Sequence, residues 1–175
     1  MLPRGSNFVR ESLVNTVTPL DSAADETPPP HAMSMVLVDD SQDLRFFLRV
    51  AIERGQDFCI VAEAANGEEG LAAAVEHQPD VVLLDIAMPV MDGLEALPLI
   101  RKACPGTVVV MLSAFGPRYG LQHQAALLGA HGYILKDGRM DRVLAELKTI
   151  IEGVGDLPAP RPRPGPARTG SSEEP

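Results

Sequence analysis

The sequence predicts an α/β fold in which a doubly wound parallel sheet of five strands carries helices on both faces. Two observations lead to this prediction. Five short apolar runs show no polar alternation, which is typical of parallel strands that are buried on both faces. Segments with apolar residues at helical spacing lie between these runs. Strict alternation of the two patterns implies a parallel sheet between two layers of helices.

The predicted strands are short and rich in β-branched residues, which favours strands over buried helix segments. They comprise residues 35–38, 58–61, 81–84, 108–112 and 133–135.

The predicted helices each show one apolar stripe at helical spacing. The stripes are Leu44, Phe47, Leu48 and Ala51; Leu71, Ala74 and Val75; Leu121, Ala125 and Leu128; and Met140, Val143, Leu144, Leu147 and Ile151.

Candidate capping residues mark where three of the helices begin. Asn66 and Asp92 are each followed three residues later by a glutamate, the spacing of an N-cap with a back-bonding carboxylate. Asp137 is a candidate cap for the last helix. Pro98 conflicts with this pattern, so the third helix either kinks there or begins later than Asp92 indicates.

Composition restricts the class of protein. The chain has 175 residues, a formal net charge of −9 and 45% hydrophobic residues, which suit one acidic domain and argue against a basic nucleic-acid binder. The two cysteines form neither a disulfide framework nor a metal site, which suggests a reducing compartment. No apolar stretch approaches the roughly 18 residues of a membrane span. We therefore expect a cytoplasmic protein without membrane contact.

The ends of the chain differ from its middle. Residues 1–32 show no lasting period and are expected to be a disordered N-terminal extension. Residues 33–153 form the predicted domain. Residues 154–175 are expected to be a disordered Pro/Arg-rich tail, with alternating prolines that favour an extended polyproline II conformation.

Polar side chains gather where the predicted strands end. Asp39 and Asp40 follow the first strand, Asp85 the third, Ser113 the fourth and Lys136 the fifth. Ligands of open parallel sheets bind beyond the carboxyl ends of the strands. The sequence therefore predicts one site at this edge.

The chemistry of this set suits phosphoryl transfer. Three carboxylates in one place repel one another, and a hard cation such as Mg²⁺ relieves the repulsion while it also binds phosphate oxygens. Lys136 adds a positive charge and Ser113 a hydroxyl donor, and both neutralise a phosphoryl group in transfer. Asp85 itself can act as the nucleophile and form an aspartyl phosphate.

Four segments together resemble the receiver domains of two-component response regulators, which are CheY-like. The resemblance covers about residues 33–153 and implies a flavodoxin-like (βα)5 fold with strand order 2-1-3-4-5. Its segments are Val38-Asp39-Asp40-Ser41, residues 84–93 (LDIAMPVMDG), Ser113-Ala114 and residues 132–137 (GYILKD).

The resemblance implies roles for the acidic residues. Asp85 matches the phosphoacceptor, which takes its phosphoryl group from a sensor histidine kinase or a histidine phosphotransfer protein. Asp40 and Asp85 match direct Mg²⁺ ligands together with the main-chain carbonyl of Ala87, while Asp39 matches a ligand that acts largely through water.

The resemblance also implies a conformational switch that responds to phosphorylation. Ser113 matches the hydroxyl that bonds the phosphoryl group, Lys136 the counter-ion, and Tyr133 the aromatic residue that turns inward as Ser113 moves. The fourth and fifth helices with the fifth strand would form the face that binds a downstream protein, and phosphorylation would favour a homodimer. The implied chemistry is self-catalysed phosphotransfer and dephosphorylation, so the domain is not expected to be an enzyme.

Two departures from the family pattern leave questions open. Lys136 is followed by Asp137, as in receivers with NarL- or LuxR-type output domains, yet residues 154–175 are too few for such a domain. We therefore expect a stand-alone receiver, with a truncated or split transcriptional regulator as an alternative. Ala87 and Phe115, two residues after Asp85 and Ser113, leave the phosphate lifetime open.

The residues argue against three further interpretations, of which only the last is kept as an alternative. A phosphatase of the haloacid dehalogenase type needs an aspartate two residues after its nucleophile, where this chain has Ala87. A flavodoxin needs a phosphate loop after the first strand, where this chain has Asp39 and Asp40. A receiver that docks partners without phosphorylation would keep the fold and lose the switch.

Overall fold

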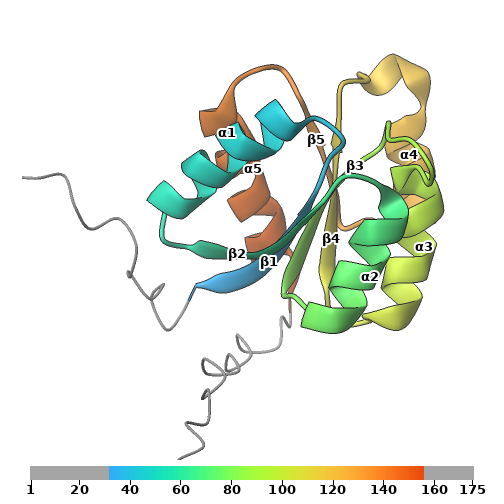
Figure 1. Ribbon diagram of the computed structural model, residues 1–175. Coiled ribbons are helices and arrows are strands. Elements are labelled where there is room, and N and C mark those ends of the chain that lie inside the picture. The colour runs from blue at the N-terminus through green and yellow to red at the C-terminus, as the bar shows by residue number, and fades with distance from the viewer. Residues whose placement is uncertain (1–31, 156–175) are drawn as a thin grey trace, which may run out of the picture.

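The computed structural model of the protein describes residues 32–155, in which five strands and five α-helices alternate (Figure 1). The strands are β1 (Met33–Val38), β2 (Phe58–Ala64), β3 (Val81–Asp85), β4 (Val108–Ser113) and β5 (Gly132–Leu135). The helices are α1 (Gln42–Arg54), α2 (Gly67–His77), α3 (Gly93–Ala103), α4 (Leu121–Leu127) and α5 (Met140–Gly153). The disorder expected for residues 1–32 and 154–175 concerns segments that lie almost wholly outside the described residues.

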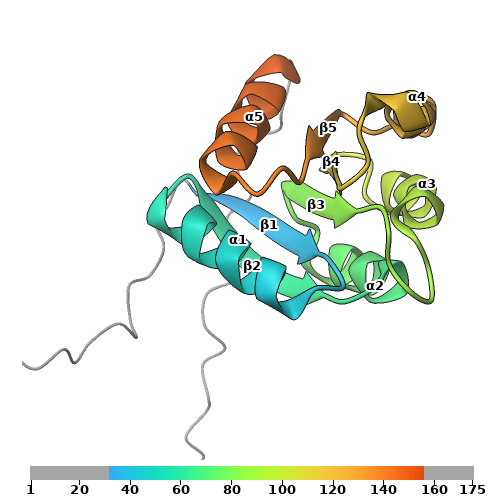
Figure 2. The same cartoon turned by 90° about the horizontal axis from the view of Figure 1, so that it is seen from above.

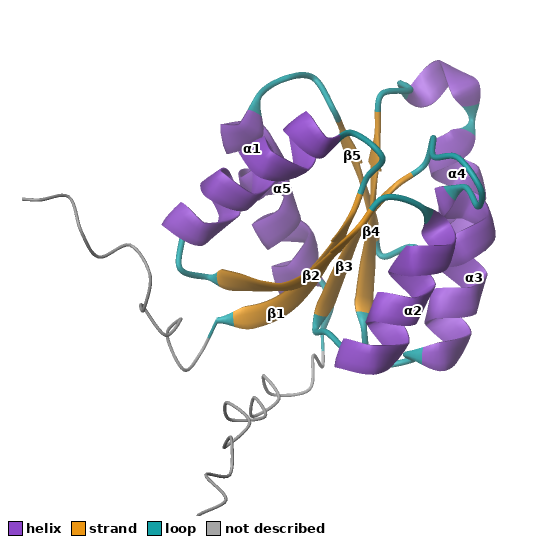
Figure 3. Ribbon diagram, viewed as in Figure 1, coloured by secondary structure: helices purple, strands orange, loops and turns teal. Residues whose placement is uncertain are grey.

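The strands form one parallel sheet with the order β2-β1-β3-β4-β5, which confirms the predicted topology. Helices α1 and α5 cover one face of this sheet, and α2, α3 and α4 cover the other (Figure 2). The sheet is thus the middle of three layers (Figure 3).

The core consists of two apolar layers, one on each side of the sheet. Strand β1 shows how they are supplied: Val36 and Val38 point to the α2–α3–α4 side, whereas Met35 and Leu37 point to the α1–α5 side. All four side chains are fully buried. Because successive strand residues face opposite sides, a strand buried on both faces must be apolar throughout. This explains the uninterrupted apolar runs.

The caps of α2 and α3 are as predicted. Asn66 Oδ1 accepts the main-chain N–H of Glu69 at 2.9 Å. Asp92 and Glu95 form a reciprocal capping box, with bonds of 2.8 and 3.1 Å. Helix α3 begins directly after Asp92 and runs through Pro98, so the later start considered above is wrong.

The prediction that Asp137 caps the last helix is also wrong. Helix α5 begins at Met140, and its N-cap Arg139 makes no side-chain capping bond. Asp137 Oδ1 instead accepts the N–H of Arg139 at 3.1 Å. This side-chain turn spans Gly138, whose φ is 80°, a conformation that favours glycine. The residues just after Asp137 therefore form a turn, whereas an N-cap at Asp137 would have placed them in the first turn of the helix.

A strained turn lies in the β3–α3 loop. Val90 has a φ of 70°, and Met91 N–H donates to the Pro89 carbonyl at 2.8 Å, which makes Val90 the centre of a γ-turn. A β-branched residue is disfavoured at positive φ, whereas glycine adopts it freely. Val90 is 78% exposed, so it contributes little packing in return.

We expect Val90→Gly to raise the free energy of unfolding by about 1 kcal/mol, because it relieves this backbone strain. Urea denaturation followed by circular dichroism measures the change. Val90→Ala is the control, since it keeps a Cβ atom and should stabilise far less. Equal stability of Val90→Gly and the native protein would contradict this account of the loop.

Candidate functional site

The predicted acidic residues meet at the carboxyl edge of the sheet. Asp39 and Asp40 follow β1 and Asp85 ends β3, and each offers one carboxylate oxygen within 4.8 Å of the other two. Strands β1 and β3 are neighbours in the sheet, and this adjacency brings residues that are far apart in the sequence together. Asp39 and Asp85 are buried, while Asp40 is exposed at the mouth of the site.

Lys136 joins two of these carboxylates. It follows β5, and its Nζ lies 2.6 Å from Asp39 Oδ2 and 2.8 Å from Asp85 Oδ1. Apart from this ion pair, the buried Asp39 Oδ2 has no hydrogen-bond partner among residues 32–155. Three carboxylates and one ammonium leave two negative charges without a counter-charge here. A hard divalent cation with oxygen ligands therefore fits this donor set.

The pKa of Asp85 is raised above its ordinary value of 3.8, chiefly because burial disfavours its charged form. The nearby Asp39 carboxylate raises it further, while the Lys136 ammonium opposes the shift. Without a metal, an ionised Asp85 is thus a net cost to the fold. In the unfolded chain Asp85 loses its proton near its ordinary pKa. The cost of its charge is therefore absent below that pH and grows as the pH rises through the folded pKa.

We expect Asp85→Asn to raise the free energy of unfolding at pH 7 in the presence of a chelator, because the variant removes this buried charge. Urea denaturation measures the effect, which should shrink as pH approaches 4. Asp43→Asn is the control, since it removes an equal charge from the exposed first turn of α1. A less stable Asp85→Asn protein would show that the Lys136 ion pair outweighs the cost of burial.

The main chain of Phe115 links the two predicted switch residues. Ser113, fully buried at the end of β4, accepts the N–H of Phe115 on its Oγ at 3.0 Å. The hydroxyl of Tyr133, on β5, donates to the carbonyl of the same Phe115 at 2.7 Å. A rearrangement of Ser113 therefore disturbs the segment to which Tyr133 is bonded.

Gly93 allows α3 to start against the end of β3, which carries Asp85. Its N–H donates to the Ile86 carbonyl at 2.9 Å. A Cβ atom at this position would lie 2.0 Å from the Asp85 carbonyl oxygen. The close approach of helix and strand, and with it the main-chain position of Asp85, depends on a residue without a side chain.

Arg45 makes contacts next to the site that were not predicted from the sequence. Its Nη1 donates to the Asp39 carbonyl, and its Nε donates to Glu63 on β2 at 3.3 Å. Its place six residues after Asp39, early in α1, was the available signal. Nothing in the apolar periodicity marks an arginine that turns back to the main chain.

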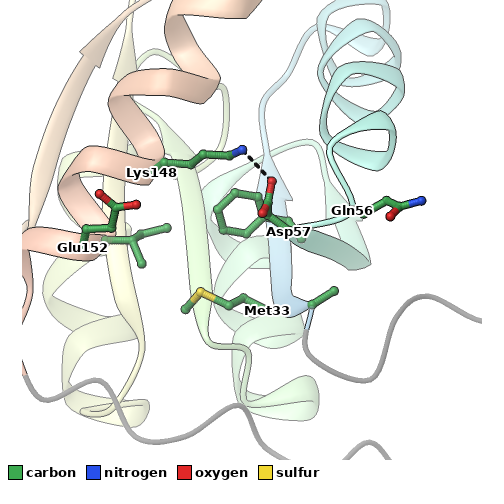
Figure 4. Close-up of a pocket in the computed structure, with 8 residues that line it drawn as sticks. Met33, Gln56, Asp57, Lys148 and Glu152 are labelled. Atoms are coloured by element: carbon green, nitrogen blue, oxygen red, sulfur yellow. Dashed lines mark ion pairs between the residues drawn. The ribbon is translucent and has the colours of Figure 1, made fainter.

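A separate hollow of about 320 Å³ lies at the opposite end of the sheet (Figure 4). Met33 and Phe58, at the amino ends of β1 and β2, line it together with residues at the end of α5. Lys148 and Asp57 form an ion pair across it. None of the predicted site residues borders this hollow, so it is separate from the candidate site at the carboxyl edge.

Comparison with known protein families shows the family to which this fold belongs. The family model of the response regulator receiver domain matches residues 35–148, which include Asp39, Asp40, Asp85, Ser113 and Lys136. The chain belongs to this family. The receiver has no helix within residues 32–155 that is long and apolar enough to cross a membrane.

Curated relatives include both small and large proteins. The chemotaxis protein CheY of Listeria monocytogenes is 41% identical over 116 residues, which are 66% of this chain and 96% of that protein. A protein-glutamate methylesterase/protein-glutamine glutaminase of Maricaulis maris is 38% identical over 145 residues. That match takes in 81% of this chain and only 36% of the relative. The chain thus spans about a third of that larger protein.

Solved structures show the same fold. The receiver domain of the putative response regulator NarL from Mycobacterium tuberculosis matches with a TM-score of 0.65 and 30% identity, over 71% of this chain and 99% of that one. A chain of the CheX–CheY–BeF3–Mg²⁺ complex from Borrelia burgdorferi matches with a TM-score of 0.63 and 30% identity, over 67% and 88%. The receiver fold and its acidic pocket are therefore consistent with phosphoacceptor signalling.

Proposed function

We propose that this receiver accepts a phosphoryl group on Asp85 from a sensor histidine kinase or a histidine phosphotransfer protein, in a Mg²⁺-dependent reaction. The observation that carries the proposal is the contact of one ammonium, Lys136, with both Asp39 and Asp85 inside a cluster of three carboxylates. Lys136 lies between two buried carboxylates and near a third. This position suits a site that must offset the negative charge of a trianionic phosphoryl-transfer transition state.

The metal would be held by Asp40, Asp85 and the main-chain carbonyl of Ala87, with Asp39 acting largely through water. When bound, Mg²⁺ supplies positive charge that the phosphoryl oxygens need in transfer. These are roles that the family resemblance assigns, and the donor set described above supports them.

The proposed phosphoryl transfer exchanges one bond to phosphorus for another. A carboxylate oxygen of Asp85 attacks the phosphorus of a phosphohistidine, and a P–O bond forms as the P–N bond breaks. The imidazole leaves with the electron pair and takes up a proton. Lys136, already 2.8 Å from Asp85, is placed to pair with the phosphoryl oxygens in the product. The chemistry of the domain is confined to this transfer and to hydrolysis of its own aspartyl phosphate.

The switch follows from the bonds of Phe115. A new phosphoryl group on Asp85 attracts the Ser113 hydroxyl. As Ser113 moves toward it, the hydrogen bond that Ser113 Oγ accepts from the Phe115 N–H breaks. The Phe115 carbonyl bonds Tyr133, so the same event alters the packing of this aromatic ring. Tyr133 borders a shallow hollow against α5, lined also by Ala145, Glu146, Thr149 and Ile150.

This hollow belongs to the α4–β5–α5 face, which we propose as the surface for a downstream protein or for a phosphorylation-dependent homodimer. We propose a cytoplasmic protein that does not itself bind nucleic acid. An output domain supplied by another chain, as in a split LuxR- or NarL-type regulator, would use the same surface.

Thermal unfolding with a phosphoryl mimic tests the proposed function. Mg²⁺ together with beryllofluoride should raise the Tm of the native receiver well above the value with Mg²⁺ alone, because the mimic binds the Asp85 carboxylate and stabilises the folded state. Asp85→Asn, which keeps the fold, should show no added rise. No added rise in the native protein, or an equal rise in Asp85→Asn, would favour a phosphorylation-independent docking module.

A further inference from the structure

The Asp39–Asp40 peptide lies just beyond the paired part of β1. The last pair of the β1–β2 ladder is Val38 with Ala64. The N–H of Asp39 still donates to the Ala64 carbonyl at 3.1 Å. The carbonyl of Asp39 follows the last ladder pair, so its orientation has to be fixed by something other than the sheet.

Arg45 supplies that fixation from α1. Its side chain is 15% exposed, and its Nη1 donates to the Asp39 carbonyl. A guanidinium presents its donors in a rigid plane, so a second bond sets the direction of the first. This second bond runs from Arg45 Nε to Glu63 Oε2 at 3.3 Å, on the edge strand β2.

Arg49, one turn further along α1, offers a natural comparison. It donates to the other oxygen of Glu63 at 3.0 Å, and its side chain is 41% exposed. Both arginines thus bind the same carboxylate and carry the same charge. Only Arg45 also bonds the Asp39 carbonyl among the described residues.

We propose that Arg45 is a positioning residue for the metal site, which it serves by holding the Asp39–Asp40 peptide. The inference rests on the proposed Mg²⁺-dependent function. A trans peptide is planar, so fixing the Asp39 carbonyl also fixes where the main chain of Asp40 begins. Mg²⁺ demands near-ideal octahedral geometry, so a carboxylate on a mobile peptide binds it less tightly.

The proposal predicts a change in Mg²⁺ affinity that is opposite in sign to the change expected from charge alone. Removing a positive charge near three carboxylates should tighten the binding of a cation. Loss of the peptide contact should weaken it. The sign of the change in Mg²⁺ affinity therefore separates positioning from long-range electrostatics.

Calorimetric titration of the full chain with Mg²⁺ provides the test. We expect Arg45→Met to raise the Kd about three- to tenfold, in line with other residues that orient metal ligands. Arg49→Met is the matched control and should leave the Kd unchanged or lower it. Arg45→Lys keeps the charge and one donor, so its Kd should fall between those of the native protein and Arg45→Met. Urea denaturation in a chelator verifies that each variant is folded.

An equal Kd for Arg45→Met and Arg49→Met would overturn the proposal, as would a tighter Kd for both. If Arg45→Met does not fold, Arg45→Lys decides: a native Kd overturns the proposal, and a raised one supports it. Absence of Mg²⁺ binding by the native protein is a different result, since it would remove the proposed function itself.

Discussion

Replacing Lys136 with methionine is expected to lower the free energy of unfolding by about 3 kcal/mol at pH 7 without divalent cations, the cost of leaving a buried charge unpaired. Lys136 bonds Asp39 at 2.6 Å and Asp85 at 2.8 Å, and both acids are buried. Without the ammonium, two carboxylates face each other with no counter-charge. Urea denaturation in a chelator measures the loss.

The loss should depend on pH. In the native protein the pKa of Asp85 is already raised above 3.8 by burial and by Asp39, and Lys136 is the group that opposes this shift. Its removal raises the folded pKa further, so the penalty is small near pH 4 and grows as pH rises. Adding Asp85→Asn to the variant should restore much of the stability.

Lys148→Met is the matched control for this variant. Lys148 forms an ion pair with Asp57, but the two side chains are 45% and 49% exposed. Surface pairs of this kind contribute about 0–1 kcal/mol, so the control should change stability little. Equal losses for the two lysine variants would contradict the central place given to Lys136 in the site.

Gly93→Ala is expected to lower the free energy of unfolding by about 3 kcal/mol, at the upper end of the cost of overpacking. The added methyl would sit 2.0 Å from the Asp85 carbonyl oxygen, a main-chain atom that cannot rotate away. Either α3 shifts away from β3 or Asp85 moves out of the site. Mg²⁺ affinity should therefore fall together with stability.

Gly116→Ala serves as its control, because a Cβ there meets nothing within 4 Å. This loop substitution should change stability by less than about 0.5 kcal/mol. A Gly93→Ala protein as stable as Gly116→Ala would show that the junction between β3 and α3 yields easily, contrary to this account.

The sheet and the position of its site could be predicted from the sequence because both depend on simple patterns. Strands such as Val81–Asp85 are apolar on both faces, and a polar residue ends or directly follows four of the five strands. Once the strands are parallel, those residues must meet at one edge. The caps at Asn66 and Asp92 were equally predictable, because capping is a local interaction within one turn.

Other features depend on tertiary contacts that no local pattern encodes. The start of α5 is displaced by the turn that Asp137 makes over Gly138. Arg45 reaches a main-chain carbonyl, and a carbonyl has no signature in the sequence. The two bonds of Phe115 join β4 to β5 through the peptide backbone, so the residue type at that position gave no signal.

The most direct test of the central claim is the intact mass of the purified protein after incubation with Mg²⁺ and acetyl phosphate, beside Asp85→Asn. We predict a gain of one phosphoryl group that requires Mg²⁺ and is absent from the variant. A gain that persists in Asp85→Asn would place the chemistry on another residue. No gain in the native protein would contradict the phosphoacceptor role and leave the acidic site with a structural or docking function.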